Sequence, residues 1–103
     1  MEQIPSLKRE DFDFVMHRGK DLILFFYREN DPASILGIQT MNEINSLLGR
    51  SFDLYLINFD EQPEIADAFS VKKIPEYITM KQTKIYKRNT ELLNASEVLE
   101  MLK

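Results

Sequence analysis

Residues 22–33 read Leu22-Ile23-Leu24-Phe25-Phe26-Tyr27-Arg28-Glu29-Asn30-Asp31-Pro32-Ala33, and this stretch decides the fold. It begins as a continuous apolar run, which is typical of a β-strand buried on both faces. The Asn-Asp-Pro sequence that follows predicts a helix start, with Asp31 as the N-cap and Pro32 at the first helical position. The carboxyl end of a central strand therefore meets a helix N-terminus, where many α/β proteins keep their functional groups.

The composition excludes several classes of function. The chain has 103 residues, which suits one domain spanning residues 1–103. Its net charge of −4 disfavours nucleic acid or an anionic membrane as a partner. Cysteine is absent, so disulfides, thiolate catalysis and cysteine metal sites are excluded. The N-terminus resembles no signal peptide, and no apolar run reaches the ~18 residues of a membrane span, so we expect a cytoplasmic protein.

Hydrophobic periodicity predicts strands and helices along the whole chain. Strands are expected at residues 4–7, 22–27, 52–59, 77–80 and 84–87. Helices are expected from residue 9 onward, at residues 32–48 and 64–69, and after the N-cap Asn94. Only three residues join the last two strands, which must therefore form an antiparallel hairpin. The order βαβαβαββα predicts an α/β fold with a mixed central sheet.

The helix at residues 32–48 has the clearest apolar stripe. Gly49 should close this helix, and Gly37 inside it marks a soft spot or a close-packing position. The residues expected to face the core are Ile35, Ile38, Met41, Ile44 or Asn45, and Leu48.

This order of elements, with its central strand, resembles the thioredoxin family over residues 4–102. The family's strand, Trp-Cys-Gly-Pro-Cys turn and helix resemble residues 22–27 followed by Glu29-Asn30-Asp31-Pro32-Ala33. A second resemblance runs from Asn58-Phe59-Asp60 and Pro63 through Phe69-Ser70-Val71 to Ile74-Pro75. The resemblance implies a three-layer α/β/α sandwich and a cis peptide bond before Pro75.

The departures from the family pattern are informative. Asn30 and Ala33 stand at the positions of the two cysteines, Leu24 at that of the buried acid, and Leu56 at that of its companion lysine. A buried carboxylate costs several kcal/mol of desolvation and persists only for function. Leucine removes that cost and adds apolar burial once the thiols are gone. We therefore expect a redox-inactive, non-enzymatic protein without a cofactor.

The resemblance also implies a groove that binds an extended protein or peptide segment, in the manner of an added β-strand. Four carboxylates would make this groove acidic, which suits a basic or polar peptide. The alternative is that an abandoned site drifted toward solubilising charge. The residues expected to line the groove are Glu29, Asn30, Asp31, Pro32, Ile74, Pro75, Glu76 and Glu91.

Two further functions stay open. One is a structural or assembly protein that uses another surface, as a homodimer, which exposed apolar residues would favour. The other is residual glutathione-dependent chemistry at Ser34, near the start of the long helix. No metal site is expected, because the acidic residues Asp60, Glu61 and Glu64 form a solvated turn and His17 has no partner ligands.

Overall fold

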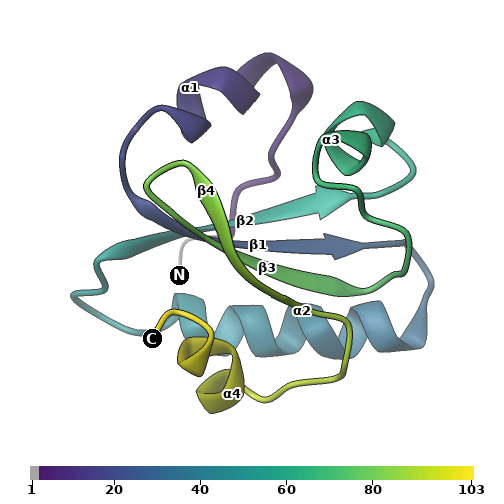
Figure 1. Ribbon diagram of the computed structural model, residues 1–103. Helices are drawn as coiled ribbons and strands as arrows, with labels where there is room; N and C mark the ends of the chain where they lie inside the picture. Colours follow the sequence, from purple (N-terminus) through teal and green to yellow (C-terminus); the bar gives the residue numbers. More distant parts are fainter. Residues whose placement is uncertain (1–2) are drawn as a thin grey trace.

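Four strands form one mixed sheet in the computed structural model, which describes residues 3–103 (Figure 1). β1 (Asp21–Tyr27) lies parallel to β2 (Phe52–Asn58) and antiparallel to β3 (Glu76–Lys81). β4 (Lys84–Asn89) pairs with β3 antiparallel, so the strand order is β2-β1-β3-β4. The predicted mixed sheet and terminal hairpin are confirmed.

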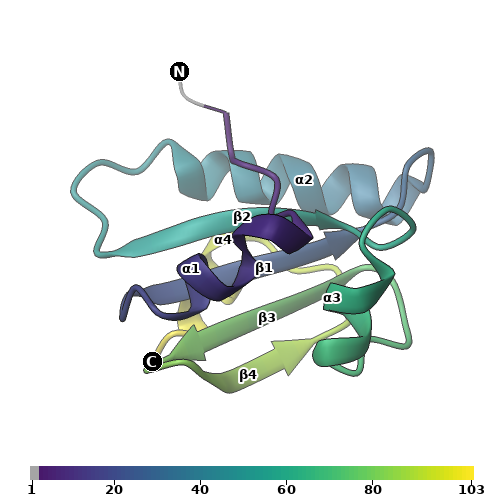
Figure 2. The same ribbon diagram turned by 90° about the horizontal axis from the view of Figure 1, so that it is seen from above.

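Helices cover both faces of this sheet (Figures 1 and 2). α2 (Pro32–Asn45) and α4 (Ala95–Glu100) lie on one face. The 3₁₀ helix η1 (Arg9–Asp11), α1 (Phe12–Met16) and α3 (Pro63–Ala68) lie on the other. The five central residues of β1 are buried because both faces are covered, as their continuous apolar run predicts. The result is the expected three-layer sandwich.

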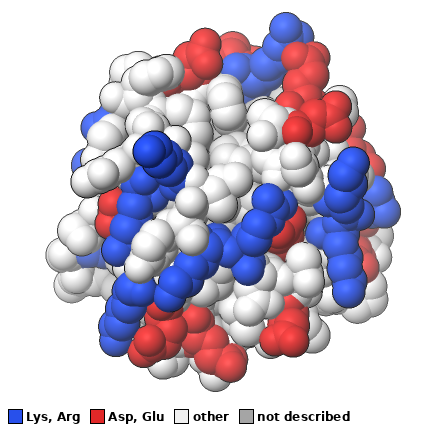
Figure 3. Space-filling view, viewed as in Figure 1, with Lys and Arg blue, Asp and Glu red and all other residues white. Residues whose placement is uncertain are grey.

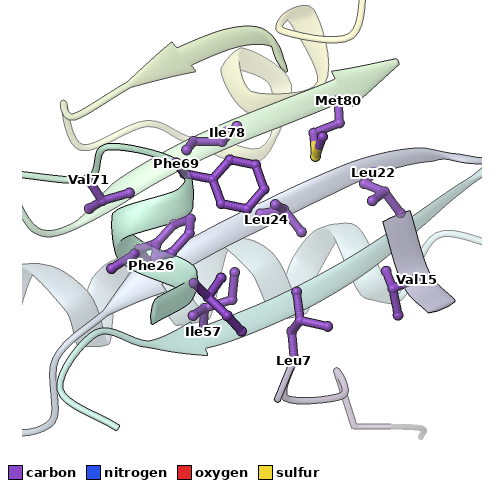
Figure 4. Packing of buried hydrophobic residues seen from close by; sticks show 12 residues of the cluster. Leu7, Val15, Leu22, Leu24, Phe26, Ile57, Phe69, Val71, Ile78 and Met80 are labelled. Carbon is purple, nitrogen blue, oxygen red and sulfur yellow. The ribbon is translucent and has the colours of Figure 1, made fainter. Parts of the chain in front are cut away.

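Leu24 lies in the core between the sheet and the α1–α3 layer (Figure 4). Its side chain is fully buried, in one cluster with Phe26 and Ile57 from the sheet and Phe69 after α3. The rings of Phe26 and Phe69 meet edge to face, with centroids 5.8 Å apart. A carboxylate at the position of Leu24 would have no water and no polar neighbour among these side chains.

The first predicted strand is reduced to a single bridge. Ser6 pairs with Leu56 in parallel at the edge of β2, and the amide of Leu7 donates to the carbonyl of Leu56 at 2.9 Å. The amide of Leu56 donates back to Pro5, and no further pairing follows in the described part of this segment. The apolar residues Ile4 and Leu7 instead anchor a short irregular segment, since both side chains are buried.

α2 ends at Asn45, three residues before the predicted end at Leu48. The guanidinium of Arg50 donates to the carbonyls of Asn45 and Leu47, at 3.1 and 3.3 Å, and so satisfies the end of the helix. Leu48 is 98% exposed, and Ile35 is also exposed, so these two positions of the predicted stripe are wrong. Gly49 lies in the following turn at φ +70° and does not close the helix itself.

The buried side of α2 is set by its smallest residue, Gly37. A Cβ atom built on Gly37 would lie 2.1 Å from Cζ of Phe25, so α2 packs directly on the ring of this β1 residue. Ser34, Met41 and Ile44 are buried along the same side of the helix. The buried stripe therefore runs through positions 34, 37, 41 and 44, and Gly37 is the close-packing position that the sequence allowed.

Candidate functional site

The junction between β1 and α2 is held by its own polar groups. The carboxylate of Asp31 accepts from the Ser34 amide at 2.9 Å, which confirms the predicted N-cap with Pro32 at the first helical position. The amide of Arg28 donates to the Ser34 hydroxyl at 3.1 Å. Asn30 adopts φ +60°, which asparagine tolerates better than most residues. The turn that carries the cysteines in thioredoxins is here a capped connection from β1 to α2.

Ser34 has little room for chemistry. Its side chain is fully buried, and its hydroxyl already accepts the Arg28 amide. A thiolate could reach this hydroxyl only if the helix start opened. The glutathione-dependent alternative therefore gains no support from the geometry of Ser34.

A second loop lies beside the junction. The peptide bond between Ile74 and Pro75 is cis, as the resemblance implied, and Pro75 is buried. Neither the amide nor the carbonyl of Ile74 hydrogen-bonds another backbone group within residues 3–103. An extended segment laid beside Ile74 could therefore pair with its backbone.

The sheet register brings the predicted groove segments to one end of the molecule. Phe26 pairs with Glu76, and Tyr77 pairs with Asn89. Beyond these paired residues, at the same end of the sheet, lie the β1–α2 turn, the loop before β3 and the segment after β4 (Figure 1). We call this end, formed by residues 28–32, 72–76 and 90–92, the junction face. All eight predicted groove residues belong to it.

The charge of the junction face differs from the prediction. Glu76 is 4% exposed, and its carboxylate receives two hydrogen bonds from the Arg88 guanidinium, at 2.6 and 3.0 Å. This carboxylate raises the pKa of Arg88 above its ordinary value. Asp31 is occupied as the N-cap. Two exposed carboxylates remain, those of Glu29 and Glu91, where the sequence suggested four. The junction face is therefore not uniformly acidic.

Two apolar residues of this region escaped the sequence analysis. Leu36 on α2 is 50% exposed, and Leu92 after β4 is 56% exposed. The hydroxyl of Thr40, one turn after Leu36, donates to the carbonyl of Leu93 at 3.0 Å and so holds the two segments together. The helical period could have identified Leu36, which lies off the buried stripe. Nothing in the sequence marks Leu92.

Tyr77 lies beneath this region with a buried hydroxyl that makes no hydrogen bond within the described residues. Burial raises the pKa of this hydroxyl. The Thr40 side chain and the Leu93 backbone lie near the hydroxyl without meeting hydrogen-bond geometry, and they oppose only part of the rise. A raised folded-state pKa means that the neutral phenol contributes its full stability below the unfolded value of about 10. That contribution is lost as the pH rises through the folded-state value.

Tyr77→Phe is therefore expected to leave stability at neutral pH unchanged or about 1 kcal/mol higher, because it removes an unsatisfied polar group. Above about pH 10 it should unfold less readily than the wild type. Urea denaturation at both pH values measures this, with Tyr86→Phe as the exposed control. A large loss of stability at neutral pH would contradict the unsatisfied hydroxyl.

The remaining sequence candidates are not brought together. His17 follows α1, and its ring nitrogen hydrogen-bonds the backbone carbonyl of Asp13 at 2.7 Å. Asp60 pairs with Arg28, and Glu64 pairs with Arg9. The described residues contain no group of three side chains that could hold a metal ion. Within residues 3–103, no helix has both the length and the hydropathy that crossing a membrane requires.

No protein-family model and no characterised protein sequence matches this chain. Solved structures do match. A thioredoxin of Malassezia sympodialis (Mala s 13) superposes with TM-score 0.86 at 13% identity, over 99% of this chain and 90% of its own. Chloroplastic thioredoxin z gives TM-score 0.83 at 14% identity, over 99% and 93%. The protein Trxlp of Edwardsiella tarda gives 0.83 at 14%, over 96% and 98%.

These likenesses show the fold. The chain has a thioredoxin-like fold and lacks the cysteine pair, because it contains no cysteine at all. The predicted fold class and resemblance are confirmed. The absence of cysteine argues against thiol–disulfide exchange, because the exchange requires an attacking thiolate.

Proposed function

We propose that this protein binds an extended segment of a partner protein at the junction face, in an accessory role without thiol chemistry. The observation that carries the proposal is the unpaired backbone of Ile74 beside the cis peptide bond. An extended segment can hydrogen-bond such a backbone as an added strand. Affinity would then come from backbone pairing and apolar contacts, since no covalent bond to a thiol is available.

Leu36 and Leu92 supply the apolar part of this interface. Both are about half exposed, and the antiparallel pairing of β3 with β4, continued past Asn89, leads Leu92 toward Ile74. Exposed apolar side chains next to an unpaired backbone favour a bound polypeptide over a soluble metabolite. The mixed charge of the face, with Glu29 and Glu91 exposed, would select among partner segments.

The proposal is tested by capture of partners from a native extract. Leu36→Asp/Leu92→Asp is expected to weaken capture of the specific partner by about tenfold or more, because it places two charges in an apolar contact. The matched control is Leu47→Asp/Leu48→Asp, which changes the same residue types at the opposite end of α2. Circular dichroism checks that both variants fold. Equal capture by the wild type and both variants would move the function to another surface.

A second candidate function is self-association, which the exposure of Leu47 and Leu48 favours. These adjacent leucines lie in the turn after α2, at the end of that helix remote from Pro32 (Figure 1). Light scattering on the purified chain tests this alternative. A wild-type dimer that becomes monomeric in Leu47→Asp/Leu48→Asp would support assembly through this turn.

A further inference from the structure

β4 is an open edge of the sheet. It pairs with β3 on one side only, and no strand follows it in the described part of the chain (Figure 2). The residues from Lys84 to Arg88 are all exposed. An edge of this kind presents unpaired backbone groups that can accept one more strand.

Charge is distributed unevenly along the chain. Residues 71–103 hold seven of the 13 Lys and Arg residues but only four of the 17 Asp and Glu residues. Within residues 3–103, none of the three lysines of the β3–β4 hairpin forms an ion pair with a side chain, and neither does Lys72 or Lys73. Lys87 Nζ donates to the main-chain oxygen of Lys103 at 3.0 Å. We call the hairpin lysines Lys81, Lys84 and Lys87 the basic edge. Figure 3 shows Lys and Arg side chains running across the face of the molecule on which β4 lies.

The ring of Tyr86 lies close to two of these lysines. The Nζ atoms of Lys81 and Lys87 lie 4.5 and 5.2 Å from the centroid of its ring. The register shifts between Thr79 and Met80, so Tyr86 has no partner on β3. The ring attracts both ammonium groups, but it also keeps two like charges near each other. A bound carboxylate would relieve that repulsion.

A depression of about 390 Å³ lies next to the basic edge, on the side of the sheet covered by α1 and α3. Ile85 of β4 and Met80 of β3 line it together with side chains from α1 and from the end of α3, and His17 and Thr83 are its polar lining residues. Its apolar lining consists of Phe12, Met16, Ala68, Phe69, Met80 and Ile85. This space suits one apolar side chain of a segment that runs along β4.

We propose that β4 binds an acidic, extended segment of a partner protein, whose carboxylates face the basic edge and whose apolar side chain enters this depression. Polypeptide fits the observations better than nucleic acid, because the edge offers backbone pairing, the depression is apolar, and the whole chain carries a net charge of −4. Lysines on an edge strand repel most other edges. These lysines attract a segment that carries carboxylates, so an acidic strand is the class of partner that they favour.

The test is a titration of the isotope-labelled protein with a synthetic peptide in which glutamates flank one leucine. NMR follows the chemical shift of each residue of the protein. Shifts are expected at β4 and at the depression, with affinity that falls as salt rises. Lys84→Glu should weaken binding about fivefold more than Lys8→Glu. Both lysines are exposed and unpaired within residues 3–103, and the N-terminal segment lies at the opposite, β2 edge of the sheet.

Several results would overturn this inference. Equal affinity for a peptide with lysines in place of the glutamates would show that charge has no role in binding. Equal effects of Lys84→Glu and Lys8→Glu would remove the basic edge from the interaction. Tighter binding of a DNA duplex would identify nucleic acid as the partner, and salt-sensitive self-association would identify a second copy. The Leu36→Asp/Leu92→Asp variant should bind the acidic peptide normally, which separates this site from the junction face.

Discussion

Arg88→Ala is expected to lower the free energy of unfolding by about 3 kcal/mol, the lower end of the range for breaking a buried ion pair. The side chain of Glu76 is 6% exposed, and its carboxylate would lose its only ion-pair partner within the described residues. The Arg88 side chain is itself 36% exposed, so water screens part of the interaction, and this argues for the lower end. Urea denaturation measures the change.

The Arg88→Ala loss has an internal control. Arg88→Met/Glu76→Leu removes both charges and should recover most of the stability, because no carboxylate is then left buried. Lys87→Ala, at the neighbouring exposed position, should change stability by less than about 0.5 kcal/mol. If the double variant were as unstable as Arg88→Ala, the lost packing of the arginine stem would be the cause instead.

Gly37→Ala should destabilise the fold by about 2 kcal/mol, although alanine is the better helix former by about 1 kcal/mol. The added Cβ would lie 2.1 Å from Cζ of Phe25 and 2.7 Å from its Cε1. The ring cannot swing aside easily, because it is fully buried and packs against Tyr77 with centroids 4.7 Å apart. Either α2 moves away from the sheet or the core repacks. Thermal and urea denaturation both report the loss.

Phe25→Leu tests whether the ring of Phe25 is the cause of the Gly37→Ala loss. Alone it should destabilise the core, because it removes part of a buried ring. Combined with Gly37→Ala it should cost less than the sum of the two single effects, since the smaller side chain makes room for the new methyl group. Strictly additive effects would show that the close contact between α2 and β1 does not limit the packing.

Much of the fold could be predicted because its signals are local. The apolar run of β1, the Asp31–Pro32 helix start and the short connection before Lys84 each depend on neighbouring residues, and each was correct. The end of α2 was wrong because periodicity continues through Leu48, whereas Arg50 caps the carbonyls at Asn45. A helix end fixed by a side chain outside the helix leaves no periodic signal.

The candidate site was harder to predict, because its charge depends on tertiary pairing. Glu76 and Arg88 lie 12 positions apart, and only the β3–β4 register shows that their side chains meet. Leu36 and Leu92 lie on segments far apart in the sequence, and the Thr40–Leu93 hydrogen bond that ties these segments together leaves no sequence signal. The sequence could place the segments of the junction face at one end of the sheet, but not the exposure of each side chain on it.

The buried position of Leu24 constrains the order of mutations by which this scaffold could acquire a dithiol with a buried acid beneath it. An aspartate introduced there first would place a carboxylate in a closed apolar core, against a total stability of about 5–15 kcal/mol. Many such chains would unfold before any advantage arose, and selection would remove them. Cysteines would have to appear first and react without an acid beneath them. Leu24 therefore disfavours one of the two mutational orders, the one in which the buried acid comes before the cysteines.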